Sequence, residues 1–277
     1  MTDDGAVALR LLLEYDSRAA NADIDHMTRR LLIAIRVALI VGTFVSISAR
    51  ASTAQATGRA ASKGAAGSTA AQRRALLLDP TRPFWSTRAP ATFTADIETS
   101  RGTITVEFTR EWAPHGVDRF YNLARAGYFD DSRFFRVLFG FVAQFGIAGD
   151  PDVANLWGRR NIAADSVREH NTRGTLSYAQ FKPSDRTTNV FINLRDNPNL
   201  DSLKFAPIGR VTQGMEVADS LFSNYGELPI SDPPLGNPKR LYAESNRYLD
   251  EKYPKLDRIV KITIRADSVP KGLRTRQ

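Results

Sequence analysis

The sequence FFRVLFGFVAQFG, residues 134–146, places an arginine inside the most apolar stretch of the C-terminal two-thirds of the chain. A buried charge requires a partner or a function, because removing it from water is costly. A tight turn centred on Gly140 would fold this stretch into two antiparallel strands, in which positions equidistant from the turn lie opposite each other. Arg136 would then face Gln144, whose amide oxygen can orient a guanidinium group without neutralising it.

The strand pairing alone does not decide between a structural and a functional role for Arg136. An arginine that is purely structural in a core usually has a carboxylate beside it. The nearest acidic residues in the sequence, Asp130, Asp131 and Asp150, lie outside the expected strand pair. Both roles therefore stay open on this observation.

The segments around this stretch predict a mainly β fold. Two alternating apolar runs within 92–109 flank a turn at Ser100-Arg101-Gly102, which indicates a β-hairpin. Helical spacing predicts one helix from Pro114 to Gly127 and a second over residues 212–222. Further apolar runs predict strands at 133–145, 174–179, 189–194, 205–211 and 256–266. Many strands, two separated helices and no βαβ rhythm favour a closed barrel or a sandwich.

The N-terminal region has the form of an export signal. Residues 27–51 combine a basic start, an apolar run and an Ala49-Arg50-Ala51 cleavage pattern, as in a signal peptide. The alternative is an uncleaved membrane anchor through residues 31–49, in which Arg36 would reach the interface. Residues 1–26 precede this signal as an extension of uncertain role, consistent with a start codon assigned too early.

The segments on either side of the expected domain have compositions typical of unstructured chain. Residues 52–91 are rich in Ala, Ser, Gly and Pro and lack apolar periodicity, so we predict a flexible linker. We place the folded domain at 92–266 and a basic tail at 267–277.

Composition excludes several classes of function. The net charge of +8 is concentrated outside the expected domain, because residues from 92 onward hold 26 basic and 23 acidic side chains. No basic patch with interleaved aromatic residues marks a nucleic-acid interface, so we expect no nucleic-acid partner. The absence of cysteine excludes disulfides, thiol catalysis and zinc–thiolate sites. The three histidines have no ligand spacing, and we expect neither a metal nor a cofactor.

Several motifs together resemble one family. The pattern FxRVxxGFxxQxG within residues 134–146, followed by RGTLSYAQ (173–180), TNVFIN (188–193) and FAPIGRV (205–211), is similar to the cyclophilin-type peptidyl-prolyl isomerases. The resemblance covers about 92–265. It is greatest to secreted bacterial members, which share an extension like YLDEKYPKLD (248–257) before the last strand. It implies a closed eight-stranded antiparallel β-barrel capped by two α-helices.

The resemblance also implies roles for particular residues. Arg136 matches the catalytic arginine and Gln144 matches the glutamine that holds it. The residues implied to bind the substrate are Phe141, Val142, Phe191 and Leu200 in the proline pocket, Ala179 and Gln180 along the substrate backbone, and Asn189 and Phe205.

Four positions depart from the family pattern. Phe135 and Phe205 stand where histidines are common, Asn189 stands where glutamine is usual, and Asn199 lies at or beside a position that often carries an indole. These differences concern substrate contacts more than the chemistry, because the arginine is retained.

We therefore expect an exported peptidyl-prolyl cis-trans isomerase, periplasmic or extracellular and monomeric, that acts on proline-containing polypeptides. The competing hypothesis is a non-catalytic module that binds proline peptides on the same scaffold. A structure in which Arg136 is locked inward against an acidic neighbour, with the apolar slot filled by the protein's own residues, would contradict the catalytic interpretation.

Overall fold

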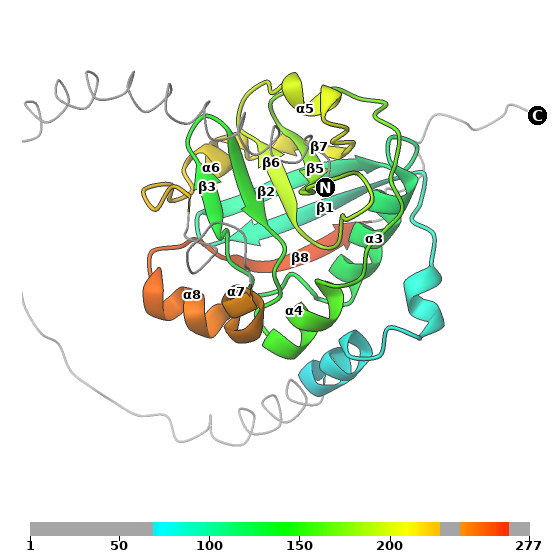
Figure 1. The fold of residues 1–277 in the computed structure, drawn as a ribbon, viewed down its shortest axis with the longest axis vertical. Helices are drawn as coiled ribbons and strands as arrows, with labels where there is room; N and C mark the ends of the chain where they lie inside the picture. The colour runs from blue at the N-terminus through cyan, green and yellow to red at the C-terminus, as the bar shows by residue number, and fades with distance from the viewer. Residues whose placement is uncertain (1–68, 228–238, 266–277) are drawn as a thin grey trace, which may run out of the picture. The chain divides into compact units, whose positions relative to one another are not determined.

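A computed structural model describes residues 69–227 and 239–265 of the chain. Its centre is one antiparallel sheet of eight strands in the order β3-β4-β6-β5-β7-β2-β1-β8 (Figure 1). The strands are β1 (Thr92–Thr99), β2 (Gly102–Thr109), β3 (Arg136–Leu138), β4 (Val142–Phe145), β5 (Thr175–Tyr178), β6 (Val190–Asn193), β7 (Pro207–Gln213) and β8 (Ile259–Arg265).

The sheet curls until its two ends meet. The segment before β3 and the segment before β8 form an isolated antiparallel bridge between Arg133 and Arg258. Two backbone hydrogen bonds flank this bridge, from Phe134 N to Asp257 O at 2.9 Å and from Ile259 N to Ser132 O at 2.8 Å. These contacts pair the two edges of the sheet and confirm the predicted eight-stranded barrel.

The predicted hairpins form with the expected register. In the first, Phe93 lies opposite Phe108 and Thr99 opposite Gly102, so the turn falls at Ser100-Arg101. In the second, between β3 and β4, Gly140 lies in the turn with a positive φ of 65°, a conformation that favours glycine.

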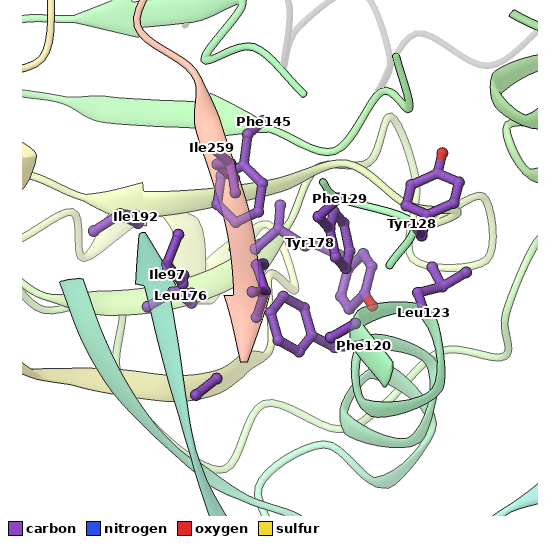
Figure 2. Packing of buried hydrophobic residues seen from close by; sticks show 14 of the residues in the cluster. Ile97, Phe120, Leu123, Tyr128, Phe129, Phe145, Leu176, Tyr178, Ile192 and Ile259 are labelled. Atoms are coloured by element: carbon purple, nitrogen blue, oxygen red, sulfur yellow. The ribbon is translucent and has the colours of Figure 1, made fainter. Parts of the chain in front are cut away.

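The barrel interior is filled by side chains. Figure 2 shows Phe120 of α3 (Pro114–Arg125) and Phe129 of the following turn inside the barrel, with Phe145 of β4 beside Phe129. Phe120 stacks on Phe108 at a centroid distance of 4.4 Å, and Phe129 packs against Phe120 at 5.1 Å. The interior is therefore a packed core, which leaves the outer face of the sheet for a binding site.

The helices agree only in part with the sequence analysis. Helix α3 forms as predicted, begins at Pro114 and contacts β7 and β8. The second predicted helix, over 212–222, is wrong in extent, since α6 covers only Met215–Asp219. Strand β7 continues through Gln213, and Gly214 follows with a φ of 83° where a Cβ would lie 2.2 Å from Thr103 O. Additional helices are α4 (Pro151–Trp157), α5 (Asn199–Ser202), α7 (Lys239–Glu244) and α8 (Asn246–Lys252).

The linker prediction is wrong for residues 69–91. Residues 69–77 are helical, and the short 3-10 helix η2 (Pro83–Ser86) follows. Leu77 is buried in the core, and its carbonyl accepts a hydrogen bond from Trp157 Nε1 at 2.8 Å. The ring of Trp85 packs on Trp157 at 4.5 Å. This segment is ordered against the barrel domain because its few large apolar side chains pack against α3 and α4.

The remaining predictions on domain organisation lie outside the described residues. They concern the extension 1–26, the signal or anchor 27–51, the linker residues 52–68 and the tail 267–277. Within the ranges 69–227 and 239–265, no helix has both the length and the apolar character to cross a bilayer.

Candidate active site

The strands β3, β4 and β6 place a polar pair and an aromatic ring in one row on the outer face of the sheet. Arg136 lies opposite Gln144, and Gln144 lies opposite Phe191. The alternating neighbours Val137, Ala143 and Ile192 are all part of the main core. Since side chains along a strand alternate between the two faces, the row faces away from the interior.

Beside this row lies a second apolar cluster, separate from the main core. Val142, Phe191 and Leu200 are buried in it. Partly buried residues that pack against these three are Phe141, Ala179, Leu203 and Phe205. The rings of Phe191 and Phe205 meet edge to face at 5.8 Å. The structure thus brings together six of the eight residues expected to bind substrate and adds Leu203, which the sequence analysis missed.

The guanidinium of Arg136 borders the cluster and is held by two side chains. Its Nη1 donates to Gln144 Oε1 at 3.3 Å, which confirms the pairing inferred from the hairpin. Its Nε donates to Glu227 Oε2 at 2.7 Å, and its Nη2 donates to Glu227 Oε1. The side chain is 15% exposed, compared with 42% for Glu227. The sequence analysis did not anticipate this acidic partner, because Glu227 lies 91 positions from Arg136 along the chain.

Although Arg136 has a carboxylate partner, the two side chains do not form an ion pair inside the barrel core. The arginine lies on the outer face of the barrel, and its acid is half-exposed. The contact is bidentate, but the carboxylate is half-exposed, so water screens the pair in part. The guanidinium is held at the surface by contacts that a ligand can exchange.

Two predicted substrate residues are directed elsewhere. Asn189 donates from Nδ2 to the hydroxyl of Tyr242 in α7 at 3.0 Å. Burial raises the pKa of that hydroxyl, so Tyr242 stays protonated. Gln180 donates from Nε2 to the carbonyls of Leu203 and Lys204 at 3.2 and 3.0 Å. Gln180 therefore holds the segment that carries Leu203 of the apolar cluster, whereas Asn189 is tied to α7.

The departure at 135 is explained by packing. Phe135 is 1% exposed and belongs to the main core. It faces away from the row because it is adjacent to Arg136 along the chain. It supplies packing and no contact to a ligand on the outer face.

A buried polar network under the cluster fixes the loop that carries Leu200. Asn197 donates from Nδ2 to Phe141 O at 3.2 Å and to Asn193 Oδ1 at 2.8 Å. Asn193 in turn donates to Thr175 Oγ1 at 2.9 Å. These amides were not predicted as site residues, although the run NLRDNPNL (193–200) supplies an unusual density of them.

Asp201 ties the same loop to a distant segment. Its carboxylate accepts from the backbone N and from Nδ2 of Asn171 at 2.9 and 2.8 Å, and it contacts His170 Nδ1 at 2.8 Å. Partial burial opposes its ionisation, but the hydrogen bonds from Asn171 and His170 outweigh that effect and lower the pKa of Asp201. The loop is therefore held by an ionised carboxylate at neutral pH.

One protein family has a sequence model that matches this chain over the strands that form the site. The family described as cyclophilin type peptidyl-prolyl cis-trans isomerase/CLD matches residues 94–237, just over half of the chain. The chain belongs to the cyclophilin family. The residues of the row and of the second apolar cluster all fall within the matched span.

Individual cyclophilins cover different shares of this chain. Peptidyl-prolyl cis-trans isomerase CYP18-2 of Arabidopsis thaliana is 34% identical over 133 residues, which make up 46% of this chain and 79% of the relative. Peptidyl-prolyl cis-trans isomerase-like 2 of Gibberella zeae is 31% identical over 154 residues, which make up 53% of this chain and 26% of the relative.

A solved cyclophilin type peptidyl-prolyl cis-trans isomerase of Cryptosporidium parvum matches with a TM-score of 0.48 and 20% identity, and the match covers 64% of this chain and 99% of that chain. These proteins are eukaryotic, so the resemblance to secreted bacterial cyclophilins stays a prediction.

Proposed function

We propose that this cyclophilin catalyses cis-trans isomerisation of Xaa-Pro peptide bonds. The observation that supports it most directly is the row on the outer face, where the Arg136 guanidinium, oriented by Gln144, borders the apolar cluster of Val142, Phe191 and Leu200. A fixed donor beside an apolar wall suits a substrate that has a ring to bind and an amide to rotate.

The chemistry needs only these two features. An amide resists rotation because the nitrogen lone pair is delocalised into the carbonyl, with a barrier of about 18–20 kcal/mol. In the twisted transition state the nitrogen regains that lone pair and can accept a hydrogen bond. A guanidinium donor therefore binds the twisted form better than either planar form, which lowers the barrier. Arginine suits this role because it keeps its protons at all physiological pH values.

The apolar cluster would hold the proline ring while the preceding residue rotates. It also excludes water, which strengthens the contact of the guanidinium with the substrate. An acceleration of about 10⁵ corresponds to roughly 7 kcal/mol, a value within reach of one charged donor combined with desolvation and orientation.

The direct test is an isomerisation assay on a blocked proline-containing tetrapeptide with wild type and Arg136→Ala. We expect Arg136→Ala to lose at least 99% of kcat/KM, roughly the 3 kcal/mol reported for one electrostatic donor in other enzymes. Arg168→Ala serves as the matched control, because Arg168 is exposed and its salt-bridge partner among the described residues is Glu111, at 3.3 Å. Equal rates for wild type and Arg136→Ala would refute catalysis by this residue.

A second candidate is a non-catalytic module that binds proline peptides. The contact between Arg136 and Glu227 favours it, because a guanidinium occupied by a carboxylate is less available to a substrate. Peptide binding in the absence of any acceleration would establish the module.

We also propose that the substrates are exported polypeptides and that the protein acts as a monomer in the periplasm or outside the cell. The support is the signal-like sequence 27–51, whose uncleaved form would tether the protein through residues 31–49. N-terminal sequencing of the protein from the exported fraction tests this. A mature chain that begins just after Ala51 supports export with cleavage, and recovery from the cytosol alone would refute it.

A further inference from the structure

Glu227 accepts hydrogen bonds from two of the five N–H groups of the Arg136 guanidinium and carries the opposite charge. Its two carboxylate oxygens accept from Nε and Nη2, and Gln144 accepts from Nη1. Every guanidinium nitrogen therefore already has a partner within the protein. One N–H on Nη1 and one on Nη2 are left for a substrate by these three bonds, but the carboxylate partly neutralises the charge that makes them strong donors.

Glu227 is held in this position by an aromatic anchor two residues earlier. The ring of Tyr225 packs against Phe222 at 4.9 Å and against Tyr253 at 5.2 Å. Its hydroxyl accepts a hydrogen bond from Lys255 N at 3.4 Å. The carboxylate is thus brought to the arginine by a packed segment that joins α6 to the end of α8.

The same carboxylate is accessible from solvent. The Glu227 side chain is 42% exposed, whereas Arg136 is 15% exposed. Among the residues that the structure describes, Glu227 is the only acidic residue paired with Arg136. A cation that approaches the outer face can therefore take the carboxylate without entering the core.

We propose that Glu227 determines the charge preference of the site: a substrate with a lysine or arginine close to its proline takes the carboxylate and frees Arg136. A neutral substrate leaves the ion pair in place, so the guanidinium acts on it with part of its charge neutralised. This inference rests on the proposed isomerase function. Since exposed ion pairs are weak, we expect a preference of about two- to fivefold rather than a strict selection.

The test uses three blocked pentapeptides, one neutral, one with a lysine two residues before proline and one with a lysine directly after it. Rates of isomerisation are measured by NMR exchange, which needs no coupling protease and allows the salt concentration to be varied. For the wild type we expect at least one lysine peptide to exceed the neutral peptide about two- to fivefold in kcat/KM. In Glu227→Gln we expect this ratio to fall close to one, while the rate on the neutral peptide rises.

The matched control is Glu216→Gln, which removes the same charge from an exposed position on α6. It should leave the peptide preference of the wild type unchanged. High salt should raise the wild-type rate on the neutral peptide and leave the rate of Glu227→Gln unchanged, because salt screens the ion pair. A purely structural role for Glu227 would produce neither effect.

The outcomes separate the two proposals. A slower rate of Glu227→Gln on the neutral peptide, or a lysine preference that survives this substitution, would overturn the role of Glu227 alone. A wild type that accelerates none of the three peptides would overturn the proposed function itself.

Discussion

Replacing Gln144 by leucine removes the amide oxygen that accepts from Arg136 and leaves a side chain of similar size. The hydrogen bond it removes is 3.3 Å long, longer than the usual charge-assisted contact of about 2.8 Å. A hydrogen bond to a charged group contributes about 1.5–3 kcal/mol, so the length places this one at the low end. About 1.4 kcal/mol corresponds to a tenfold effect, and we expect Gln144→Leu to lower kcat/KM about tenfold.

The structure also indicates where the arginine would go. Without Gln144, the contacts to Glu227 are the remaining side-chain hydrogen bonds of the guanidinium among the described residues. The guanidinium should then turn towards Glu227, away from the apolar cluster. Removing Glu227 as well should therefore lessen the cost of Gln144→Leu, so that the effects of the two substitutions are not additive.

The assay is kcat/KM for a neutral proline peptide in the wild type, the two single variants Gln144→Leu and Glu227→Gln, and the double variant. Gln213→Leu, at the exposed end of β7, makes the same chemical change away from the site and should match the wild type. A rate for Gln144→Leu within twofold of the wild type, with an unchanged melting temperature, would refute the positioning role of Gln144.

Three further predictions test the fold and the site. Leu77→Ala should lower the free energy of unfolding, measured by denaturant titration, by about 2 kcal/mol, which is the low end for a buried leucine. Gln72→Ala, on the exposed part of the same helix, should have no effect. Phe191→Leu should raise KM several-fold with little change in kcat, because the apolar cluster binds the substrate equally well in the ground state and in the transition state. Because the folded pKa of Asp201 lies below the ordinary 3.8, its stabilising effect is complete above about pH 4 and is lost as the pH falls below 3.8. Melting temperatures measured from pH 7 to pH 3 should fall less for Asp201→Asn than for the wild type, and parallel curves would contradict the assignment.

The β3–β4 hairpin could be predicted from the sequence because its signals are local. The alternation of apolar residues fixes which face each side chain takes, and Gly140 fixes the centre of the turn. Those two facts place Arg136 opposite Gln144, as the structure confirms. The structure also brings the predicted residues Phe141, Val142, Ala179, Phe191, Leu200 and Phe205 together in the apolar cluster, while their roles toward a substrate stay a prediction.

The segment before the barrel could not be predicted in the same way. Its Ala- and Pro-rich composition is typical of a linker, and Leu77 and Trp85 are too few to show a period. Their partner, Trp157, lies in α4, a helix of seven residues whose N-terminus is capped by Asp150 through its own side chain. A helix of that length gives no detectable apolar repeat, so neither partner indicated the other.

Two unpredicted contacts of the site share one origin, the chain that connects α6 to β8. Glu227 reaches Arg136 from 91 positions away, and Tyr242 in the same connection takes the amide of Asn189, 53 positions away. Arg133, three residues before Arg136, is held by Asp250 of α8 at 2.8 Å. The connection therefore contacts the chain just before β3 and just before β6. Because these contacts are made between side chains far apart in sequence, strand periodicity carries no trace of them. The described residues of this connection are thus anchored on the barrel at Arg133 and at Asn189, in addition to the contact of Glu227 with Arg136.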